Sequence, residues 1–502
     1  MQNLINSTYE HRLAFALHQI DNRGLLLEQK KLEIAKKHAE DELISNCNQL
    51  SNIMNMKIFI GKDNEPDKSL KSLNINAPTK VLETLKELGF NVPKVRKKNE
   101  ETEEYEMVES VDKLVLQMIL ADPTRWPQGT QYSSAGNTGG DLIRLLLNTK
   151  ETITFRNRYL NAKLWRNLYF CNSNVAATVT GRRGTKKNIF GLGGNNQNFP
   201  ARGRLSDSWK ECIISKPGTI FFIVDQISAE DWPVQALSEN HTALDEMRRE
   251  VNRHYKFASA IFGISVNDLK YLRSDKNPDL VSRTDAEMKY YFGKKGRHSN
   301  NYGTQARRMS EALAAEGYTV PQPMCKNILD IIDREDPNVK RIFHKYIQDE
   351  LSKSTHCLKT PLGRERQFFG LRSGEKNYST LNEAYAWIPQ STIGDNTGLA
   401  ILFLEELRNF ALSNSNVVQE SHDSICQECA DNESELVRVF QDTKNSFTRS
   451  ITFHNGISVE IPIEGTLSFD WKNKVKLEHF TEEGMVEAYK KLKDSYQCGS
   501  TT

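Results

Sequence analysis

The chain has 502 residues, with 67 Lys and Arg against 65 Asp and Glu and a net charge of +2. This length allows three or four modules with their own cores. The chain has no overall excess of basic residues, so a nucleic-acid-binding surface would require basic residues to be clustered. No run of 18 apolar residues occurs, which excludes an apolar membrane-spanning helix, and the eight scattered cysteines fit reduced thiols in a cytosol-like compartment.

Helical periodicity dominates the first hundred residues. It covers residues 9 to 56 with a break at Asp21–Gly24, which predicts two helices, the second starting at Leu25. A third helix should begin after Asn76-Ala-Pro. The charge run KVRKKNEETEEYE, residues 94 to 106, is typical of a solvated, flexible link.

The middle of the chain combines basic helices with a long loop. Residues 141 to 168 are predicted to be helical, with Arg and Lys interspersed. Residues 178 to 204 are rich in Gly, Asn and Arg and predict a long loop, which in a compact domain is usually functional or disordered.

A short apolar run, Ile220–Val224, predicts a buried strand that ends on Asp225. A carboxylate at the end of a buried strand costs free energy unless a partner such as a divalent cation compensates it. Glu230 follows five residues later. The alternative is that Asp225 is the N-cap of a helix that begins near Ser228.

Two further stretches carry candidate functional residues. Residues 294 to 303, KKGRHSNNYG, predict a helix on which Lys294, His298 and Tyr302 share one face. An exposed basic helix is the alternative. Glu420 to Ser424, flanked by apolar residues, predicts a β-hairpin with His422-Asp423 at its tip.

An Asp at a strand end, a Lys helix that ends in Tyr-Gly, and a His-Asp hairpin, in this order, resemble the family A DNA polymerases, those like bacterial DNA polymerase I and its phage relatives. The resemblance runs from about Tyr9 to the C-terminal region. It includes the following stretches: Thr180-Gly181-Arg182, Gln197-Asn198-Phe199-Pro200, His254 with Phe262, residues 360 to 370, residues 387 to 398 and residues 459 to 473.

The resemblance implies an α+β, right-hand polymerase fold with a helical thumb, an antiparallel β-sheet palm and helical fingers. Four parts are expected: 1–150 as connecting helices and thumb, 151–237 as the first part of the palm, 238–385 as fingers with a nucleotide-binding helix at about 285–303, and 386–502 as the second part of the palm with the C-terminal strand and a polar tail from residue 492.

The implied activity is template-directed DNA synthesis in phage or bacterial replication, in which deoxynucleoside triphosphates are added to a primer 3′ end by two-metal phosphoryl transfer. The implied cofactors are two Mg²⁺ ions, with Mn²⁺ as a substitute. Expected partners are primer-template DNA, dNTPs and a separate 3′–5′ exonuclease or replication accessory protein, because no exonuclease module precedes Tyr9. No membrane partner is expected, and the implied location is the cytoplasm of a bacterium or of a phage host.

The resemblance also assigns site residues. The expected metal ligands are Asp225, Asp423 and the main-chain carbonyl of Gln226, and both aspartates count as catalytic together with Lys294. The expected nucleotide-binding residues are Lys294 on the triphosphate, His298 by the base and sugar, Tyr302 by the template base, Glu230 against the ribose 2′-hydroxyl, His254 on the β-phosphate, and Arg297. The expected primer or template contacts are Thr180, Arg182, Gln197, Asn198, Arg364, Gln390 and His422.

The sequence departs from the family pattern at several positions. Tyr290 stands where relatives usually have an Arg, for which Lys289, Lys295 or Arg297 would substitute. Asn252 stands where they usually have Asp. Ser424 stands where some have a third carboxylate, for which Glu428 would substitute.

Two alternatives stay open. One is a single-subunit RNA polymerase, whose hairpin usually reads His-Asp-Ser, although Glu230 favours deoxyribose. The other is a nucleic-acid-binding module with a polymerase fold and no catalysis.

Overall fold

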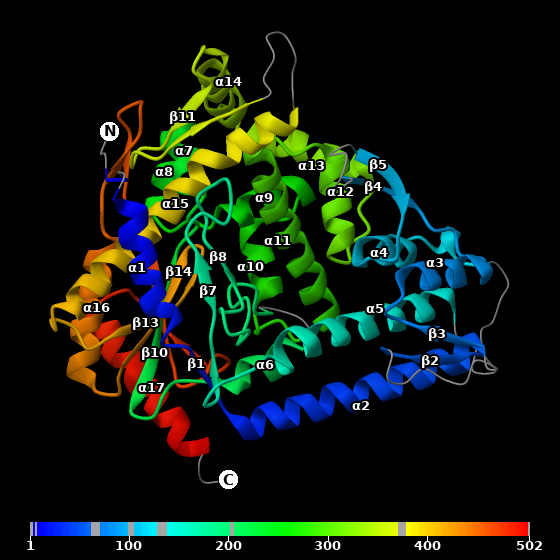
Figure 1. The fold of residues 1–502 in the computed structure, drawn as a ribbon. Coiled ribbons are helices and arrows are strands. Elements are labelled where there is room, and N and C mark those ends of the chain that lie inside the picture. Colours follow the sequence, from blue (N-terminus) through cyan, green and yellow to red (C-terminus); the bar gives the residue numbers. More distant parts are fainter. Residues whose placement is uncertain are drawn as a thin grey trace. The chain divides into compact units, whose positions relative to one another are not determined.

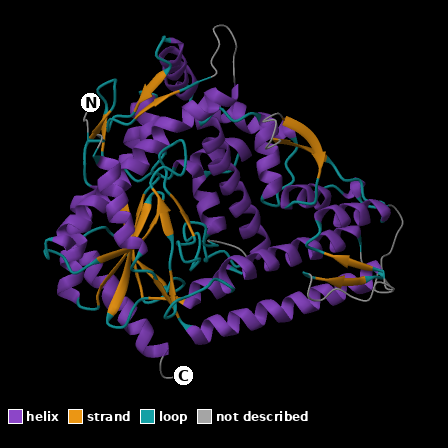
Figure 2. Cartoon of the chain, viewed as in Figure 1, coloured by secondary structure: helices purple, strands orange, loops and turns teal. Residues whose placement is uncertain are grey.

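The computed structural model describes residues 4–5, 8–61, 71–98, 105–127, 138–200, 205–369 and 378–499. Helices and strands are mixed throughout the chain (Figures 1 and 2). The chain forms two compact units. Unit 1 comprises Met1–Leu32, Ala162–Thr304 and Ile328–Thr502, and unit 2 comprises Glu33–Asn161 and Gln305–Asn327.

The centre of unit 1 is a five-stranded antiparallel sheet. Its order is β13-β14-β10-β17-β18, with bounds β10 Thr219–Gln226, β13 Asn416–Ser421, β14 Ser424–Ala430, β17 Ile463–Ser468 and β18 Lys474–Lys476. The apolar run expected to be a strand is the middle strand, β10, and Phe221, Phe222 and Val224 are fully buried. The register pairs Asp225 with Ser424 on one side and with Glu464 on the other.

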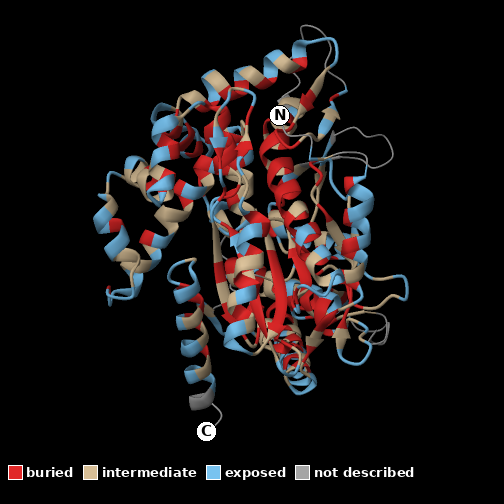
Figure 3. Cartoon of the chain, turned by 90° about the vertical axis from the view of Figure 1, so that its left-hand side faces the viewer, coloured by how far each residue is buried: buried red, intermediate tan, exposed pale blue. Residues whose placement is uncertain are grey.

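Helices bury one large core against this sheet, and the strands are mostly buried (Figure 3). The core joins sheet residues such as Phe222 and Leu467 to side chains of four helices, which are α1 Tyr9–Asp21, α15 Tyr378–Asn409, α16 Glu433–Phe447 and α17 Glu482–Gly499.

A second core and a small helix cluster complete the helical part of unit 1. The second core gathers around Trp387 of α15 and includes α7 Asp231–Leu237, α8 His241–Arg248, η3 Val339–His344 and α14 Lys345–Ser352. A smaller cluster joins α9 Arg253–Phe262, α10 Val266–Arg273 and α11 Leu280–Asn301. The remaining helices of the unit are α6 Ser206–Cys212 and most of α13 Gln322–Glu335.

Short strands surround these cores. They are β1 Leu25–Leu27, β6 Leu168–Tyr169, β7 Asn172–Asn174, β8 Gly184–Lys186, β9 Ile213–Ile214, β11 Cys357–Lys359, β12 Glu365–Gln367, β15 Ile451–Thr452 and β16 Ser458–Val459. The expectation that a helix starts at Leu25 is wrong, because Leu25–Leu27 pairs as a strand with β6 and β9, and the helix begins at Gln29.

Unit 2 is built mainly from helices around its own core. Its elements are most of α2 Gln29–Met54, β2 Lys57–Phe59, β3 Ser72–Asn74, α3 Pro78–Glu87, β4 Lys94–Lys98, β5 Tyr105–Glu109, α4 Lys113–Ala121, η1 Pro123–Arg125, α5 Gly139–Phe155, η2 Arg156–Leu160, α12 Ala306–Ala315 and the start of α13. The core contains Leu50, Leu85, Val115 and Ile143.

The described ends of the charge run do not form a flexible link, because β4 and β5 pair antiparallel, with Lys94 opposite Glu109 and Lys97 opposite Glu106. Opposite charges on facing positions favour this pairing. Residues 99 to 104 lie outside the described part of the chain.

Three other boundaries differ from the sequence prediction. The helix expected over 141–168 ends at Leu160. Within the expected long loop, Gly184–Lys186 pairs with β7. The tail expected from residue 492 is helical, as part of α17, as far as Gly499. The division into thumb, palm and fingers stays a prediction. No helix among the described residues is long and apolar enough to cross a membrane.

Candidate active site

The end of β10 and the tip of the β13–β14 hairpin bring Asp225 and Asp423 together. His422 has φ +59°, as the tight turn of a two-residue hairpin requires. The Gln226 backbone N–H donates to the Asp423 carbonyl oxygen at 3.2 Å, which locks the hairpin tip to the strand end. The sequence prediction of a strand-end Asp beside a hairpin Asp is therefore confirmed in its local structure.

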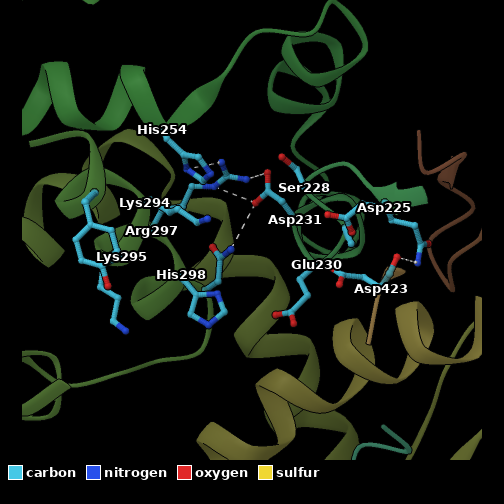
Figure 4. Close-up of a pocket in the computed structure, with 14 residues that line it drawn as sticks. Asp225, Ser228, Glu230, Asp231, His254, Lys294, Lys295, Arg297, His298 and Asp423 are labelled. Atoms are coloured by element: carbon cyan, nitrogen blue, oxygen red, sulfur yellow. Dashed lines mark hydrogen bonds and ion pairs between the residues drawn. The ribbon is translucent and has the colours of Figure 1, made fainter. Parts of the chain in front are cut away.

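These two carboxylates open onto a cavity of about 460 Å³. Its lining comprises Asp225, Gln226, Ser228, Ala229, Glu230, Asp231, His254, Tyr291, Lys294, Lys295, Arg297, His298, Asn301 and Asp423. Asp225, Asp423 and Glu230 lie along one side, and Lys294, Lys295, His254 and His298 lie along the other (Figure 4). The cavity therefore has an acidic wall from the sheet and the start of α7, and a basic wall from α9 and α11.

The carboxylates of the acidic wall repel one another. Loss of solvation, with the charges of Asp423 and Glu464, raises the pKa of Asp225 to about 7. Loss of solvation, with the charge of Glu230, also raises the pKa of Asp423. Within the described part of the chain, no Lys or Arg forms an ion pair with either aspartate.

This donor set fits a hard divalent cation. Carboxylate and carbonyl oxygens are the ligands Mg²⁺ prefers, and a cation there would relieve the repulsion that raises both pKa values. No group of three or more His, Cys, Asp or Glu side chains among the described residues is placed to hold a metal ion, so the protein offers two carboxylates and the Gln226 main chain at this point.

Glu428, expected as a third carboxylate beside Asp225 and Asp423, does not lie near them. Glu428, the expected substitute for the acid missing at Ser424, faces Phe221 in register, and its Oε2 lies 2.7 Å from the Lys216 Nζ. That expectation is wrong. Glu464 stands opposite Asp225 in register and forms an ion pair with Lys476.

The basic wall depends on a close approach of α9 and α11. A Cβ at Gly293 would lie 2.7 Å from the His254 carbonyl oxygen and 2.8 Å from the Ala258 nitrogen, so only glycine fits there. This approach places Lys294 beside His254. Burial, with the charge of Lys294, lowers the pKa of His254 to about 4, so the imidazole is neutral at pH 7. Lys294 is exposed to the cavity and forms no ion pair with any described residue.

Arg297 reaches the cavity, but its guanidinium is already engaged. Its Nε donates to Asp231 Oδ1 at 3.0 Å, and its Nη2 pairs with the other Asp231 oxygen. Arg253 also pairs with Asp231, at 3.4 Å, and with Asp336 at 2.8 Å. Four buried charged side chains thus link α7, α9, α11 and the segment before η3.

Glu230 occupies the N-cap position of α7, yet its side chain makes no capping bond. Its carboxylate instead accepts from Arg182 Nη2 and from the Tyr302 hydroxyl. Gln390 also hydrogen-bonds the Tyr302 hydroxyl. His298 contacts the Tyr302 ring edge to face, with 4.9 Å between centroids. The structure therefore brings together Arg182, Glu230, Tyr302, His298 and Gln390.

Tyr290, which replaces the usual Arg, packs among other basic and aromatic side chains. The Arg273 guanidinium lies 3.6 Å from the centre of its ring, and its hydroxyl accepts from Asn252 Nδ2 at 3.1 Å. Its ring meets that of His254 edge to face. Of the expected substitutes, Lys289 pairs with Asp285, whereas Lys295 lines the cavity.

Most residues expected to contact primer or template lie at the hairpin and near the two ends of the 178–200 segment. Gln197 Nε2 donates to Glu420 Oε2 at 2.8 Å, and the Thr180 carbonyl accepts from Ser391 at 2.7 Å. Asn198 is exposed. Nδ1 of His422 is buried and has no hydrogen-bond partner among the described residues.

Arg364 is largely committed to other protein groups. It donates from Nε and Nη2 to the Asp395 carboxylate at 2.8 to 3.1 Å and pairs with Glu10 at 2.9 Å. Its guanidinium packs against Gly181, where a Cβ would meet it at 2.9 Å. Arg364 thus supports the turn that carries Arg182.

Sequence reasoning missed several residues that position the site. Asn396 and Thr397 of α15 bond both ends of the Gln226 side-chain amide, at 2.6 and 2.9 Å, and Thr397 also donates to the His422 carbonyl. Glu420 holds buried Arg183 at 2.8 Å. In the sequence, the only indication of these positioning residues is that each is a polar residue near apolar stretches.

No family model matches the sequence, and no curated protein matches it. Among solved structures, the chain is similar to the POL domain of Pol1 from M. smegmatis, solved in complex with a DNA primer-template and a dNTP. The similarity has a TM-score of 0.70 at 15% sequence identity and covers 92% of this chain and 70% of that chain. The chain therefore has the fold of a DNA polymerase domain, as the sequence resemblance implied.

Proposed function

We propose that this chain is a template-directed DNA polymerase of the family A type, which adds deoxynucleoside triphosphates to a primer 3′ end. The observation that carries the proposal is the cavity in which Asp225 and Asp423 face Lys294 and His254. The similar solved structure supports it, because that polymerase domain holds a DNA primer-template and a dNTP.

The acidic wall would hold two Mg²⁺ ions through Asp225, Asp423 and the Gln226 carbonyl. When bound, such ions neutralise the triphosphate and lower the pKa of the attacking hydroxyl. Phosphoryl transfer needs charge neutralisation and positioning more than covalent chemistry, so a site of two aspartates on adjacent strand ends is sufficient from the protein.

The basic wall would bind the triphosphate. Lys294 presents an ammonium group with no described acidic partner, and neutral His254 can donate one N–H to a phosphate oxygen. His298 offers a flat ring beside the position of base and sugar. Nδ1 of His422, beside Asp423, has no hydrogen-bond partner among the described residues, and a primer group would supply one.

Glu230 would exclude ribonucleotides. Arg182 and Tyr302 hold its carboxylate on the acidic wall, where the sugar of a nucleotide bound between Asp225 and Lys294 would pass. In the right-hand description, the five-stranded sheet would be the palm, α9 to α11 would belong to the fingers, and the helices within residues 1–150 would form the thumb.

A primer-extension assay tests the proposal. The protein is incubated with a primed DNA template and Mg²⁺, with dNTPs in one arm and rNTPs in another, and with matched reactions that contain EDTA or an unprimed template. Extension with dNTPs that requires primer, template and Mg²⁺ is expected. Extension with rNTPs alone would assign RNA synthesis instead, and no extension in either arm would leave only a binding module.

A further inference from the structure

One segment has a strong charge bias that the overall balance hides. Residues 152 to 206 contain no Asp or Glu, although acids and bases are nearly equal over the whole chain. The segment contains the following basic residues: Arg156, Arg158, Lys163, Arg166, Arg182, Arg183, Lys186, Lys187, Arg202 and Arg204. Arg156, Arg182 and Arg183 pair with acids from other segments, whereas Lys186 and Lys187 form no ion pair with any described residue and so keep uncompensated positive charge.

Within this segment, residues 183 to 197 form a loop whose two ends are held together by one residue next to the candidate site. Glu420, three residues before Asp423, accepts from Arg183 at 2.8 Å and from Gln197 at 2.8 Å, so one carboxylate holds both ends. The β13 strand that carries Glu420 thereby fixes the base of this loop beside the cavity.

Further hydrogen bonds fix the residues near the two ends of the loop. Thr185 bonds the side chains of Asn195 and Asn196, each at 2.9 Å. The Gly193 N–H donates to the Lys163 carbonyl at 2.8 Å, and Gly193 has φ +63°. A Cβ there would clash with the Phe170 carbonyl, so glycine is required.

The tip of the loop displays apolar side chains to solvent. Ile189 is 83% exposed and Phe190 is 77% exposed, and Lys186 and Lys187 beside them are also exposed. The Asn188 side chain accepts from the backbone of Phe190 at 3.0 Å and of Leu192 at 2.9 Å, which fixes the turn. We call Lys186, Lys187, Ile189 and Phe190 the basic tip.

We infer that the basic tip binds the nucleic-acid strand next to the candidate active site, with Lys186 and Lys187 on phosphates and Phe190 stacked on an unpaired base. The inference rests on the proposed function for the identity of the strand. An exposed aromatic ring close to two exposed lysines fits single-stranded nucleic acid, which offers phosphates and a free base face. A fixed turn presents this ring with little further loss of conformational entropy.

Binding measurements test the inference on the full chain. The dissociation constant is measured by fluorescence anisotropy for a primed template with a single-stranded 5′ overhang and for a blunt duplex, across a salt series. Phe190→Ser should weaken overhang binding about 10-fold and leave blunt-duplex binding unchanged, because stacking needs an unpaired base. Phe410→Ser, at another exposed ring, is the control.

The lysines are tested by the salt dependence. Lys186→Ala/Lys187→Ala should reduce the slope of log K against log salt by about 1.5, as the loss of two phosphate contacts predicts. Lys490→Ala/Lys491→Ala, two adjacent exposed lysines of α17, should change it little. Basic-tip variants with control-level binding and slope would overturn the inference, and an equal loss on blunt duplex would overturn the assignment to an unpaired base.

Primer extension separates this inference from the proposed function. If the wild-type chain binds overhang DNA through the basic tip but extends no primer, the function fails and the inference stands. If the chain extends primers and the basic-tip variants bind and extend like wild type, the inference fails and the function stands.

Discussion

At the scale of single residues, the pairing of Asp225 with Asp423 depends on backbone geometry. The Gln226 N–H and the positive φ of His422 bring the two carboxylates together, and no described Lys or Arg neutralises them. A bound cation would relieve the repulsion that raises the pKa of both carboxyl groups. Both side chains are therefore expected to matter for catalysis and not for folding.

Asp423→Asn keeps the shape of the hairpin tip and removes one charged ligand. Primer extension should fall by about three orders of magnitude, comparable to the loss of a major electrostatic element. DNA affinity should be retained, because Lys and Arg contacts to phosphates dominate it. Asp245→Asn, at an exposed carboxylate on α8, should extend normally, and an Asp423→Asn protein that matches it would refute the metal-ligand assignment.

Glu230→Ala should let the chain use ribonucleotides. The side chain makes no capping bond to α7, so its role in the contact with Arg182 and Tyr302 can be separated from helix capping. We expect the ratio of kcat/KM for dCTP over rCTP opposite G to fall by about 10²–10³-fold, since the loss of one opposing side chain is worth a few kcal/mol.

Tyr302→Phe is the matched control for this measurement, because it removes one hydrogen bond to Glu230 and keeps the carboxylate. Its sugar ratio should stay closer to that of the wild type. A Glu230→Ala protein that still extends with dNTPs and has an unchanged ratio would exclude Glu230 as the sugar filter and would favour RNA synthesis.

At the scale of elements, the buried network of Asp231, Arg297, Arg253 and Asp336 joins three helices and the segment before η3, and Asp231 and Arg297 also line the cavity. Two arginines share the carboxylate of Asp231, so its removal leaves buried positive charge uncompensated. The network also orients the basic wall, because Arg297 lies on α11 three residues after Lys294.

Asp231→Ala should lower the free energy of unfolding by about 3–5 kcal/mol, the usual cost of breaking a buried pair. Addition of Arg297→Met should recover part of this loss, because the uncompensated charge is gone. Urea titration of both variants measures the coupling. Asp245→Ala, which breaks an exposed pair with Arg248, should cost less than about 1 kcal/mol, and equal costs would show that the buried network is not a stabilising unit.

His344, at the end of η3, should make stability depend on pH. Burial lowers its pKa from 6.5 to about 4, while its Nε2 lies 2.9 Å from the Asn301 carbonyl and its ring stacks on Tyr385. Below pH 6.5 the unfolded chain binds a proton at His344 that the folded chain does not, so stability falls as pH falls from 6.5 to about 4.

From pH 7 to pH 5 this residue should cost about 2 kcal/mol of unfolding free energy. His344→Gln should reduce the difference between the two pH values by that amount. His241→Gln, at an exposed histidine of α8, should leave the difference unchanged. A wild-type protein with equal stability at both pH values would contradict the assignment.

The elements that were predictable from sequence carry local patterns. The apolar run of β10, the hairpin tip at His422-Asp423 and the periodicity of α11 each appear within about ten residues. The partners of charged side chains were not predictable in this way. Glu420 meets Arg183 at a separation of 237 residues, and Arg364 meets Asp395 at 31, so only the folded chain shows which charges are engaged.

One short apolar run caused the wrong helix start at Leu25. Leu25–Leu27 continues a helical pattern in sequence, but its pairing with β6 and β9, both far along the chain, makes it a strand. Tertiary pairing overrides local propensity in such cases.

At the scale of the whole molecule, both compact units are discontinuous in sequence. Unit 1 is interrupted twice by unit 2, so contacts that complete its sheet join distant parts of the chain. Three short patterns on three separate segments nevertheless indicated the candidate site. Two of them carry an aspartate at an element end, Asp225 on β10 and Asp423 at the hairpin tip, and the third carries Lys294 inside α11.

The position of β10 in its sheet has a consequence for synthesis in the cell. Both neighbours of β10, the strands β14 and β17, begin about 200 residues or more after β10 ends. At ordinary translation rates the ribosome needs about 10–40 s to make that stretch, and during this time Phe221 and Phe222 lack the strands that bury them. We therefore expect the nascent chain to expose this apolar strand for longer than most single domains take to fold, and chaperones that shield such segments to bind it.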